Sequence, residues 1–474
     1  MRTEYLIAWL LPLLAGGGLA WLLHGRAAWR ASLGASAGAG WILGVFGAAA
    51  LAGCLARADT RHALELAAPW LAGAGLLCWA AAVVVRWRRP AAAAMPVPAQ
   101  PLQTGWRLVW WLLLAVVLLR LVLLGDEAAL RPVFPWDAWS AWALKPKSWL
   151  LLGQADPYVP MLDWLADPTT AARTTATWNY PELLAWIEVW FASGAGGWNE
   201  PLVDLAWLGA LAALALAAYG YWRGLGLSAP LAMGLVYALV SLPLLDAHVA
   251  LAGYADLWVG VALGLAMLAW SRWLVFREPG QWLLAAVLAA CLPLIKQEGM
   301  VWLLLLAFVA ALERVPRRWR RAAGGTALLL VAAWFVLASL GVPVGLGDSA
   351  NGHVALPGVP AFDLGWHPVG GSMLASLFTL PNWHLFWYAF PLLLVVRWRR
   401  LRGDPAAALL ALLALLQGAF LFVLFFFTSA GAWAEDYTSA NRLILQIVPG
   451  LFALAAVLLR PLPDALADQP STRP

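Results

Sequence analysis

Long apolar runs recur along the whole chain and set the strongest limit on its fold. "YLIAWLLPLLAGGGLAWLL" stands near the start, and "LLALLALLQGAFLFVLFFF" lies close to the end. Runs of about 20 apolar residues match the hydrocarbon core of a bilayer, which is roughly 30 Å thick. Inside that core each backbone N–H and C=O must be bonded within its own helix. The sequence therefore predicts an all-α polytopic membrane protein.

Composition and charge agree with this prediction. The 474 residues are 63% hydrophobic and only 12% charged, about half the charged fraction of a soluble domain. The excess positive charge lies in short arginine clusters between apolar runs, "RWRRP" (86–90), "ERVPRRWRR" (313–321) and "RWRRLR" (397–402). Such clusters are retained on the cytoplasmic side of a membrane, so no nucleic-acid partner is implied. The three cysteines fall inside apolar runs and imply no disulfide framework.

Thirteen segments are predicted to cross the membrane. They cover residues 4–23, 38–56, 66–85, 106–125, 200–221, 229–246, 255–275, 280–296, 299–312, 322–342, 372–396, 405–427 and 442–460.

One further apolar stretch, "YPELLAWIEVWFASGA" (180–195), decides the topology. It is shorter than all but one of the others and carries Glu182 and Glu188. If it crosses, two of the three arginine clusters lie opposite the first; if it lies in the interface, all three share the cytoplasmic face. The charge rule favours a juxtamembrane helix in the first external loop, with the amino terminus outside and the carboxyl terminus inside. A short true span is the alternative.

Four regions follow from this topology. Residues 1–90 form an accessory set of transmembrane helices, and the Pro/Ala-rich segment 91–105 is a linker. Residues 106–460 form the main module, which contains the external loop 126–199, and residues 461–474 are a cytoplasmic tail.

"VFPWDAWSAWALKPKSW" (133–149) follows the fourth predicted span and holds one acid among tryptophans. An interfacial aromatic belt, with Asp137 capping a helix, is the structural interpretation. The functional interpretation has Asp137 facing a cavity and taking a proton from an incoming hydroxyl group. Lys145 and Lys147 are either anchors that snorkel to the interface or partners of a lipid-linked phosphate.

Three later segments place ionisable residues at the same external boundary. "GYADL" (253–257) carries Asp256, which can cap the next helix or act in a site. "LIKQEGMVW" (294–302) has Lys296 and Glu298 with hardly any polar loop around them, and ionisable groups this close to lipid are costly unless they are functional. Arg442 begins the last span, where either a phosphate or a nearby acid such as Glu435 or Asp436 can pair with it.

The signatures of several enzyme classes do not occur in the sequence. There is no GxxxxGK[ST], HExxH, GxSxG or paired CxxC motif, and the six histidines are scattered. The candidate site therefore consists of acids and bases at the external boundary of the membrane.

The order of these motifs resembles GT-C-fold membrane glycosyltransferases. "WDAWSAWALKPKSW" is similar to the start of their first external loop, and "YPELLAWIEVWF" with "GWNEPLVDLAWLGAL" is similar to its second half. "GYADLWVGVALGLAML", "LIKQEGMVWLLL" and "NRLILQIVPG" resemble later helices. The likeness covers roughly residues 106 to 460 and is to the group of protein O-mannosyltransferases and aminoarabinose transferases, in particular bacterial members without an assigned substrate.

The resemblance implies a GT-C-like fold and an inverting transfer of sugar from a polyprenyl-phosphate donor on the outer face. The family's first-loop acid, the catalytic base, falls on Asp137. A second acid often follows it directly, but Ala138 stands there, and Asp163 is the preferred substitute over Asp156 and Asp167. "YPEL" at Tyr180 replaces the family's "PPL".

The predicted site needs a base, cations for the departing phosphate and groups that position the substrates. The scheme requires no metal or cofactor; a divalent ion shared by Asp137 and Asp256 is the alternative. The residues predicted to bind substrate or phosphate are Tyr180, Lys145, Lys147, Asp256, Lys296, Glu298 and Arg442.

Three rival functions, one of them that of a purely structural membrane subunit, and the cellular location complete the predictions. A transporter or flippase of lipid-linked saccharides would carry polar groups near the bilayer midplane, and an O-antigen ligase or polymerase would carry an Arg/His-rich external loop. The acceptor is a lipid, a glycan or a protein. Arginine-rich, lysine-poor composition without an Asn-x-Ser/Thr sequon suits the inner membrane of a bacterium, with the active face periplasmic.

Overall fold

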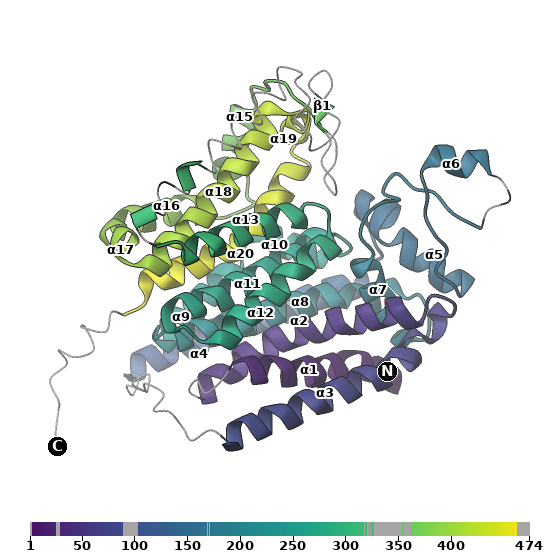
Figure 1. Ribbon diagram of the computed structural model, residues 1–474, viewed down its shortest axis with the longest axis horizontal. Coiled ribbons are helices and arrows are strands. Elements are labelled where there is room, and N and C mark those ends of the chain that lie inside the picture. Colours follow the sequence, from purple (N-terminus) through teal and green to yellow (C-terminus); the bar gives the residue numbers. More distant parts are fainter. Residues whose placement is uncertain are drawn as a thin grey trace.

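The computed structural model consists almost entirely of helices (Figure 1). It describes residues 2–24, 29–88, 103–316 except 168 and 170, positions 318, 319, 322 and 324–326, and residues 353–354 and 362–461. Eight helices in these ranges are long and apolar enough to cross a membrane. The chain is thus an all-α, multi-pass membrane protein. The eight are α1 (Thr3–Leu23), α2 (Trp29–Leu55), α3 (Ala63–Arg88), α4 (Thr104–Leu130), α8 (Glu200–Gly224), α11 (Ala255–Phe276), α18 (Pro405–Phe427) and α20 (Ser439–Leu459).

Side-chain caps fix where two of these helices begin. The Asn199 side chain accepts a hydrogen bond from the Leu202 amide at the start of α8, and Asp404 does the same for the Ala406 amide in α18. Proline occupies the first turn in both helices, where its missing N–H has no intrahelical partner to lose. The polar residue that ends one loop therefore also starts the next apolar helix.

The predicted span 229–246 is a bent pair of helices. α9 (Ala229–Val240) and α10 (Pro243–Ala250) meet at 60°. Pro243 lacks the N–H that would continue α9 and disfavours helical geometry at the residue before it. Counted as one crossing, this pair raises the number of spans in the described ranges to nine.

Four other predicted spans are not among the crossings found in the described ranges. The segments 280–296 and 299–312 are α12 (Pro279–Ile295) and α13 (Gly299–Arg314), which are shorter than a full span. The segment 372–396 is broken, and 322–342 lies almost wholly outside the described residues. The broken segment contains α15 (Gly370–Leu374), the π-helical turn η4 (Ala375–Thr379) and α16 (Phe386–Val396).

α7 (Leu183–Ala195) is the apolar stretch on which the topology depended. Its 13 residues are too few for a span at about 1.5 Å of rise per residue. It is nevertheless no surface helix, because all its residues except Ser193 and Ala195 are buried. The prediction of a helix lying in the membrane interface is therefore wrong about its surroundings: α7 packs inside the protein against α1, α2 and α8.

The N-terminal helices share one core with the rest of the chain. A side chain at Gly38 of α2 would meet the Ala213 carbonyl of α8 at 2.1 Å, so glycine lets the two backbones approach closely. Trp190 of α7 donates to the Ala8 carbonyl of α1 at 2.9 Å. The linker predicted at 91–105 is described only from residue 103, and the tail 461–474 only at Pro461.

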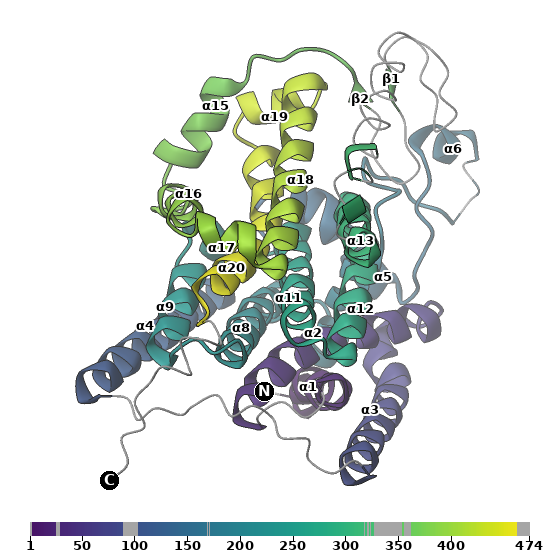
Figure 2. The ribbon, with the colours of Figure 1, turned by 60° about the vertical axis from the view of Figure 1, so that its left-hand side comes forward.

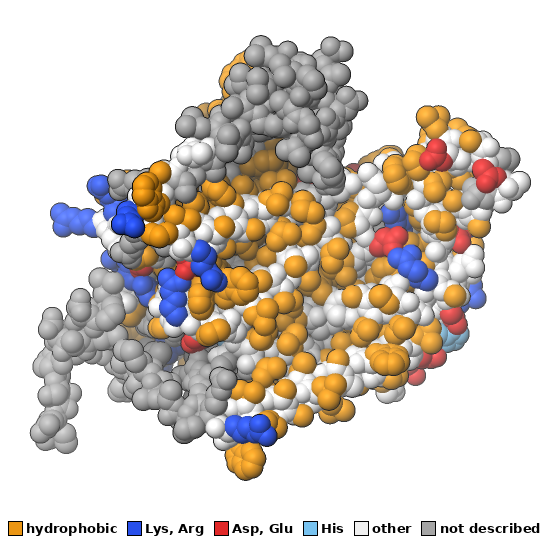
Figure 3. All heavy atoms as spheres, viewed as in Figure 1, with side chains coloured by type: hydrophobic (Ala, Val, Ile, Leu, Met, Phe, Trp, Pro, Cys, Tyr) orange, Lys and Arg blue, Asp and Glu red, His pale blue; other side chains and the backbone are white. Residues whose placement is uncertain are grey.

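The two ends of the bundle differ in charge. Figure 1 shows the N-terminus at the same end as the 126–199 segment, whereas α20 finishes at the opposite end. In Figure 3, lysine and arginine side chains gather mainly at the end where α20 finishes, and most visible acidic side chains lie at the other end. The remaining elements are short: η1 (Thr60–His62), η2 (Ala138–Trp142), α5 (Leu144–Leu152), α6 (Met161–Ala166), α17 (Trp398–Gly403), α19 (Gly431–Glu435), and strands β1 (His353–Val354) and β2 (Phe362–Asp363), which pair antiparallel.

Candidate functional site

Asp137 and Arg442 form an ion pair although 305 residues separate them in the chain. Arg442 Nη1 donates to Asp137 Oδ2 at 2.6 Å, and its Nη2 donates to the Ser439 hydroxyl at 2.6 Å. The guanidinium carbon of Arg442 also lies 4.7 Å from the ring centroid of Tyr254. The predicted alternative partners Glu435 and Asp436 are therefore not the residues that bind Arg442. The Asp137 side chain keeps 41% of its surface exposed, which leaves it accessible to a second molecule.

A second, buried group of polar side chains centres on Asp256. Its Oδ1 accepts hydrogen bonds from Lys296 Nζ at 2.9 Å and from Gln446 Nε2 at 2.6 Å. Lys296 Nζ also lies 3.2 Å from Glu298 Oε1. Trp302 Nε1 donates to Gln446 Oε1 at 2.5 Å and fixes the orientation of the amide. The Asp256 side chain is fully buried and that of Lys296 is 7% exposed.

The charges of both groups influence the pKa of Tyr180. Burial raises the pKa of Tyr180, and the negative charges of Glu298 and Asp256 raise it further. Asp137 adds to this effect, whereas Lys296 opposes it. We call the combined set the charged cluster, which consists of Asp137, Tyr180, Asp256, Lys296, Glu298 and Arg442.

Two carboxylate oxygens of the charged cluster accept no hydrogen bond from the described residues. Asp256 Oδ2 and Glu298 Oε2 are buried and have no hydrogen-bond partner among the described residues. Three carboxylates face two cations here, so the set carries a formal charge of −1. Removing charges from water costs several kcal/mol for each ion, and such sites near lipid are retained for function. The arrangement can hold a proton acceptor beside two cations.

Ala138 replaces the second acid of the resembled family, and its surroundings leave no room for one. Ala138 is fully buried, and its Cβ lies 2.5 Å from the position that a Cβ on Gly253 would occupy. Gly253 itself has a φ of 110°, a backbone conformation that favours glycine. The "GYADL" loop therefore packs directly against the residue that follows Asp137.

Gly253→Ala is expected to lower the free energy of unfolding by about 1–3 kcal/mol, because the new methyl group meets Ala138 and the positive φ becomes strained. The measurement is thermal unfolding of the purified protein in detergent. Gly234→Ala in α9 is the matched control, since no atom lies within 4 Å of its added Cβ. Equal melting temperatures for the two variants would show that the contact does not constrain the Asp137 segment.

Three predicted residues of the external loop are not members of the charged cluster, although Lys145 bonds to the backbone of one member, Tyr180. Lys145 is buried, and its Nζ donates to the carbonyls of Trp178 and Tyr180 at 2.8 and 3.1 Å. Burial lowers the pKa of Lys145. Lys147 pairs with Glu200 Oε1 at 2.8 Å. Asp163 is exposed on α6.

These contacts give the two lysines a structural role in the loop. Lys145 ties α5 to the segment that carries Tyr180, so it positions the charged cluster through the backbone. Lys147 fastens the same helix to the start of α8. Asp163 has no contact with the charged cluster among the described residues and supplies no second carboxylate there.

Sequence reasoning missed four residues around the charged cluster. Gln446 follows Arg442 by four residues, and Trp302 follows Glu298 by four, so each lies one helical turn from a predicted residue on the same face. This spacing is the signal that could have found them. Tyr254 and the buried His248, whose ring lies 5.4 Å from that of Tyr254, carry no comparable signal.

Metal ligands do not form a group in the described part of the chain. No three His, Cys, Asp or Glu side chains there are arranged to hold an ion. Asp137 and Asp256, the two carboxylates considered for a shared divalent ion, each pair with a different cation.

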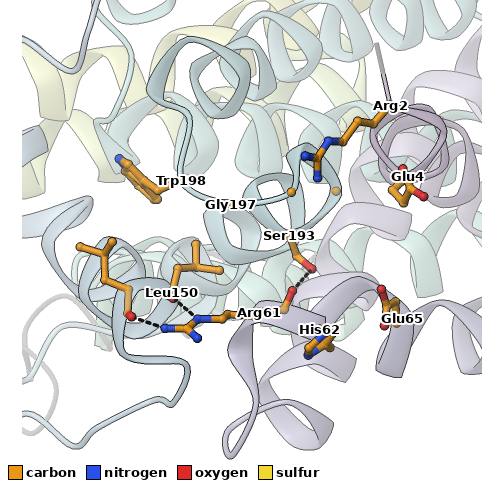
Figure 4. Close-up of a pocket in the computed structure, with 12 residues that line it drawn as sticks. Arg2, Glu4, Arg61, His62, Glu65, Leu150, Ser193, Gly197 and Trp198 are labelled. Carbon is orange, nitrogen blue, oxygen red and sulfur yellow. Dashed lines mark hydrogen bonds between the residues drawn. The ribbon is translucent and has the colours of Figure 1, made fainter.

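A separate cavity of about 690 Å³ lies between the N-terminal helices and the external loop (Figure 4). Its walls include Arg2 and Glu4 at the start of α1, Arg61 after α2, and Ser193 at the end of α7. Arg61 is already bound to the Leu150 carbonyl at 3.1 Å, as the dashed line in Figure 4 shows. No member of the charged cluster lines this cavity, so the two places are distinct.

Comparison with protein-family models, with curated proteins and with solved structures finds no match to this chain. The class that the fold defines is that of multi-pass, all-α membrane proteins with a charged cluster near one end of the helices.

Proposed function

We propose that the protein is an inverting glycosyltransferase of GT-C type, which moves a sugar from a polyprenyl-phosphate donor to an acceptor. The observation that supports this most is the ion pair between Asp137 and Arg442, formed next to the buried group of Asp256 and Lys296. It combines an accessible carboxylate with two cations taken from distant helices. These are the groups that such a transfer needs.

Asp137 serves as the general base in this proposal. Its carboxylate is partly exposed, so an acceptor hydroxyl can reach it and give up a proton to it. Arg442 keeps the carboxylate in place through the 2.6 Å hydrogen bond. The acceptor oxygen attacks the anomeric carbon while the bond from that carbon to the phosphate oxygen breaks, which inverts the configuration.

Arg442 and Lys296 stabilise the leaving phosphate in this proposal. Negative charge grows on the phosphate as the bond breaks, and cations held in place in a poorly solvated site stabilise that charge most. Lys296 is held by Asp256 and Glu298, and Arg442 by Asp137 and Ser439. The electron pair of the broken bond stays on the released polyprenyl phosphate.

The aromatic residues around Asp137 suit a lipid-linked donor. Trp136 and Trp139 are 70% and 46% exposed, and tryptophan prefers the level of the lipid head groups. A donor phosphate at this level would have its polyprenyl chain among lipids. The proposal places the reaction on the external face of a bacterial inner membrane, with a lipid, a glycan or a protein as acceptor.

A transporter of lipid-linked saccharides is the second candidate, because of the bent pair α9 and α10. Interrupted helices with buried polar groups are typical of transporters. The bend of 60° precedes His248, which is buried near Tyr254.

Reconstitution in liposomes is expected to show one polyprenyl phosphate released for each sugar transferred. The donor is first identified as the lipid-linked sugar that accumulates in a deletion strain, and it is then supplied to the purified protein. Movement of intact donor across the membrane without release of polyprenyl phosphate would contradict the proposal and support the transporter. An empty liposome with the same lipids is the control.

A further inference from the structure

An apolar groove of about 370 Å³ lies between α9, α16 and α20, away from the charged cluster. Its walls include Leu242, which follows α9, Phe390 of α16, and Phe452 and Ala455 of α20. The neighbouring residues Leu392 and Val396 of α16 are 61% and 69% exposed, so this side of the protein faces lipid. Figures 1 and 2 both show α9, α16, α17 and α20 close together.

Arginines crowd the end of the groove that is farther from the charged cluster. We call Arg397, Arg399, Arg400 and Arg402, together with Arg460 at the end of α20, the arginine group.

The two inner members, Arg400 and Arg460, have hydrogen-bond partners for only some of their N–H groups. Arg460 Nη2 donates to Asp404 Oδ2 at 2.7 Å, and Arg400 donates to the Arg460 carbonyl. Arg400 Nε and Nη2 and Arg460 Nε are buried and have no hydrogen-bond partner among the described residues. The Arg400 and Arg460 side chains are 11% and 16% exposed.

Positive charge exceeds negative charge around Arg400 and Arg460, which favours the binding of an anion. Asp404 is the one acid that pairs with Arg400 and Arg460 in the described contacts. Burial lowers the pKa of Arg400, and the neighbouring Arg460 lowers it further. A bound anion would relieve both penalties, and guanidinium groups bind phosphate oxygens through paired hydrogen bonds.

We propose that the groove and the two inner members of the arginine group, Arg400 and Arg460, together bind one anionic phospholipid of the leaflet at the end of α20. Its phosphate lies on Arg400 and Arg460, and one acyl chain fills the groove. The site is separate from the charged cluster, so it does not depend on the proposed glycosyl transfer. A structural lipid here would hold α16 and α17 against α20.

The spacing along α20 fits a single leaflet. Phe452 precedes Arg460 by eight residues, which is roughly 12 Å along a helix. Half of the hydrocarbon core is about 15 Å thick. A lipid whose phosphate is bound at Arg460 therefore has its chain at the depth of Phe452.

The test is lipid binding by native mass spectrometry, with dioleoyl phosphatidylglycerol and dioleoyl phosphatidylcholine as probes. The wild-type protein is expected to bind the anionic lipid about tenfold more tightly, since each arginine near a lipid phosphate contributes several-fold. Arg400→Gln should weaken binding of the anionic lipid about tenfold and leave the zwitterionic lipid unchanged. Arg399→Gln is the matched control: it removes the same charge from an exposed position of α17.

A groove variant tests the acyl-chain half independently of the arginines. Ala389 lines the groove and is exposed, so Ala389→Trp should fill the groove and weaken both lipids. Equal affinity for the two lipids, or an equal loss in Arg399→Gln and Arg400→Gln, would overturn the proposal. Displacement of the anionic lipid by millimolar inorganic phosphate, combined with no effect of Ala389→Trp, would assign the arginines to a soluble anion instead.

Discussion

Asp137→Asn is expected to lower the rate of sugar transfer by about 10²- to 10⁴-fold, the usual contribution of a general base. The amide has nearly the same shape as the carboxylate but cannot accept the proton of the acceptor. It can still accept a hydrogen bond from Arg442, so the local geometry should persist. The measurement is release of polyprenyl phosphate from the reconstituted protein at saturating donor.

Folding of the Asp137→Asn variant should be close to that of the wild type. The Asp137 carboxylate is 41% exposed, and ion pairs with exposed partners contribute only about 0–1 kcal/mol. Asp163→Asn is the matched control, because it removes an exposed aspartate from the same external segment. Full activity in Asp137→Asn, or an equal loss in both variants, would exclude Asp137 as the base.

The members of the charged cluster could be predicted because each is an ionisable or aromatic residue beside an apolar run. Lys296 and Glu298 stand between two apolar helices with no polar loop to explain them, and Asp256 and Arg442 open apolar spans. Such residues are costly near lipid. The convergence of Asp256, Lys296 and Glu298 on Tyr180, however, is a property of the packing and cannot be read from any single segment.

The number of spans could not be predicted, because hydropathy measures apolar content and not surroundings. α12 and α16 are as apolar as a span but shorter than one. α7 is buried against other helices and not against lipid. A short helix in a protein interior and a helix in lipid need the same kind of side chain, so their sequences look alike.

The residues that sequence reasoning missed are polar groups whose importance comes from a partner. Gln446 matters because its amide links Trp302 to Asp256, and Tyr254 because its ring lies under Arg442. An amide or a tyrosine near a helix end is common in membrane proteins. Neither carries a signal until the partner is known.

Lys296→Met is expected to destabilise the protein by about 3–5 kcal/mol, the usual effect of removing one partner of a buried ion pair. The loss leaves Asp256, which is fully buried, with Gln446 as its only remaining partner among the described residues. Asp256→Leu should cost less, because Lys296 keeps Glu298 at 3.2 Å. Lys147→Met is the control, since its partly exposed pair with Glu200 should contribute about 0–1 kcal/mol.

The double variant Asp256→Leu/Lys296→Met separates the stability of this pair from its proposed role in binding the donor phosphate. Replacing both charges by apolar groups removes the unpaired Asp256 carboxylate, but Glu298, whose side chain is 15% exposed, still loses Lys296. Thermal unfolding in detergent should therefore recover only part of the stability lost in Lys296→Met, which is about 3–5 kcal/mol. Transfer should stay impaired, with a raised KM for the polyprenyl-phosphate donor and an unchanged KM for the acceptor, because Arg442 alone then faces the phosphate. A stable double variant with a wild-type KM for the donor would mean that Lys296 only neutralises Asp256, and the leaving phosphate would have to be bound elsewhere.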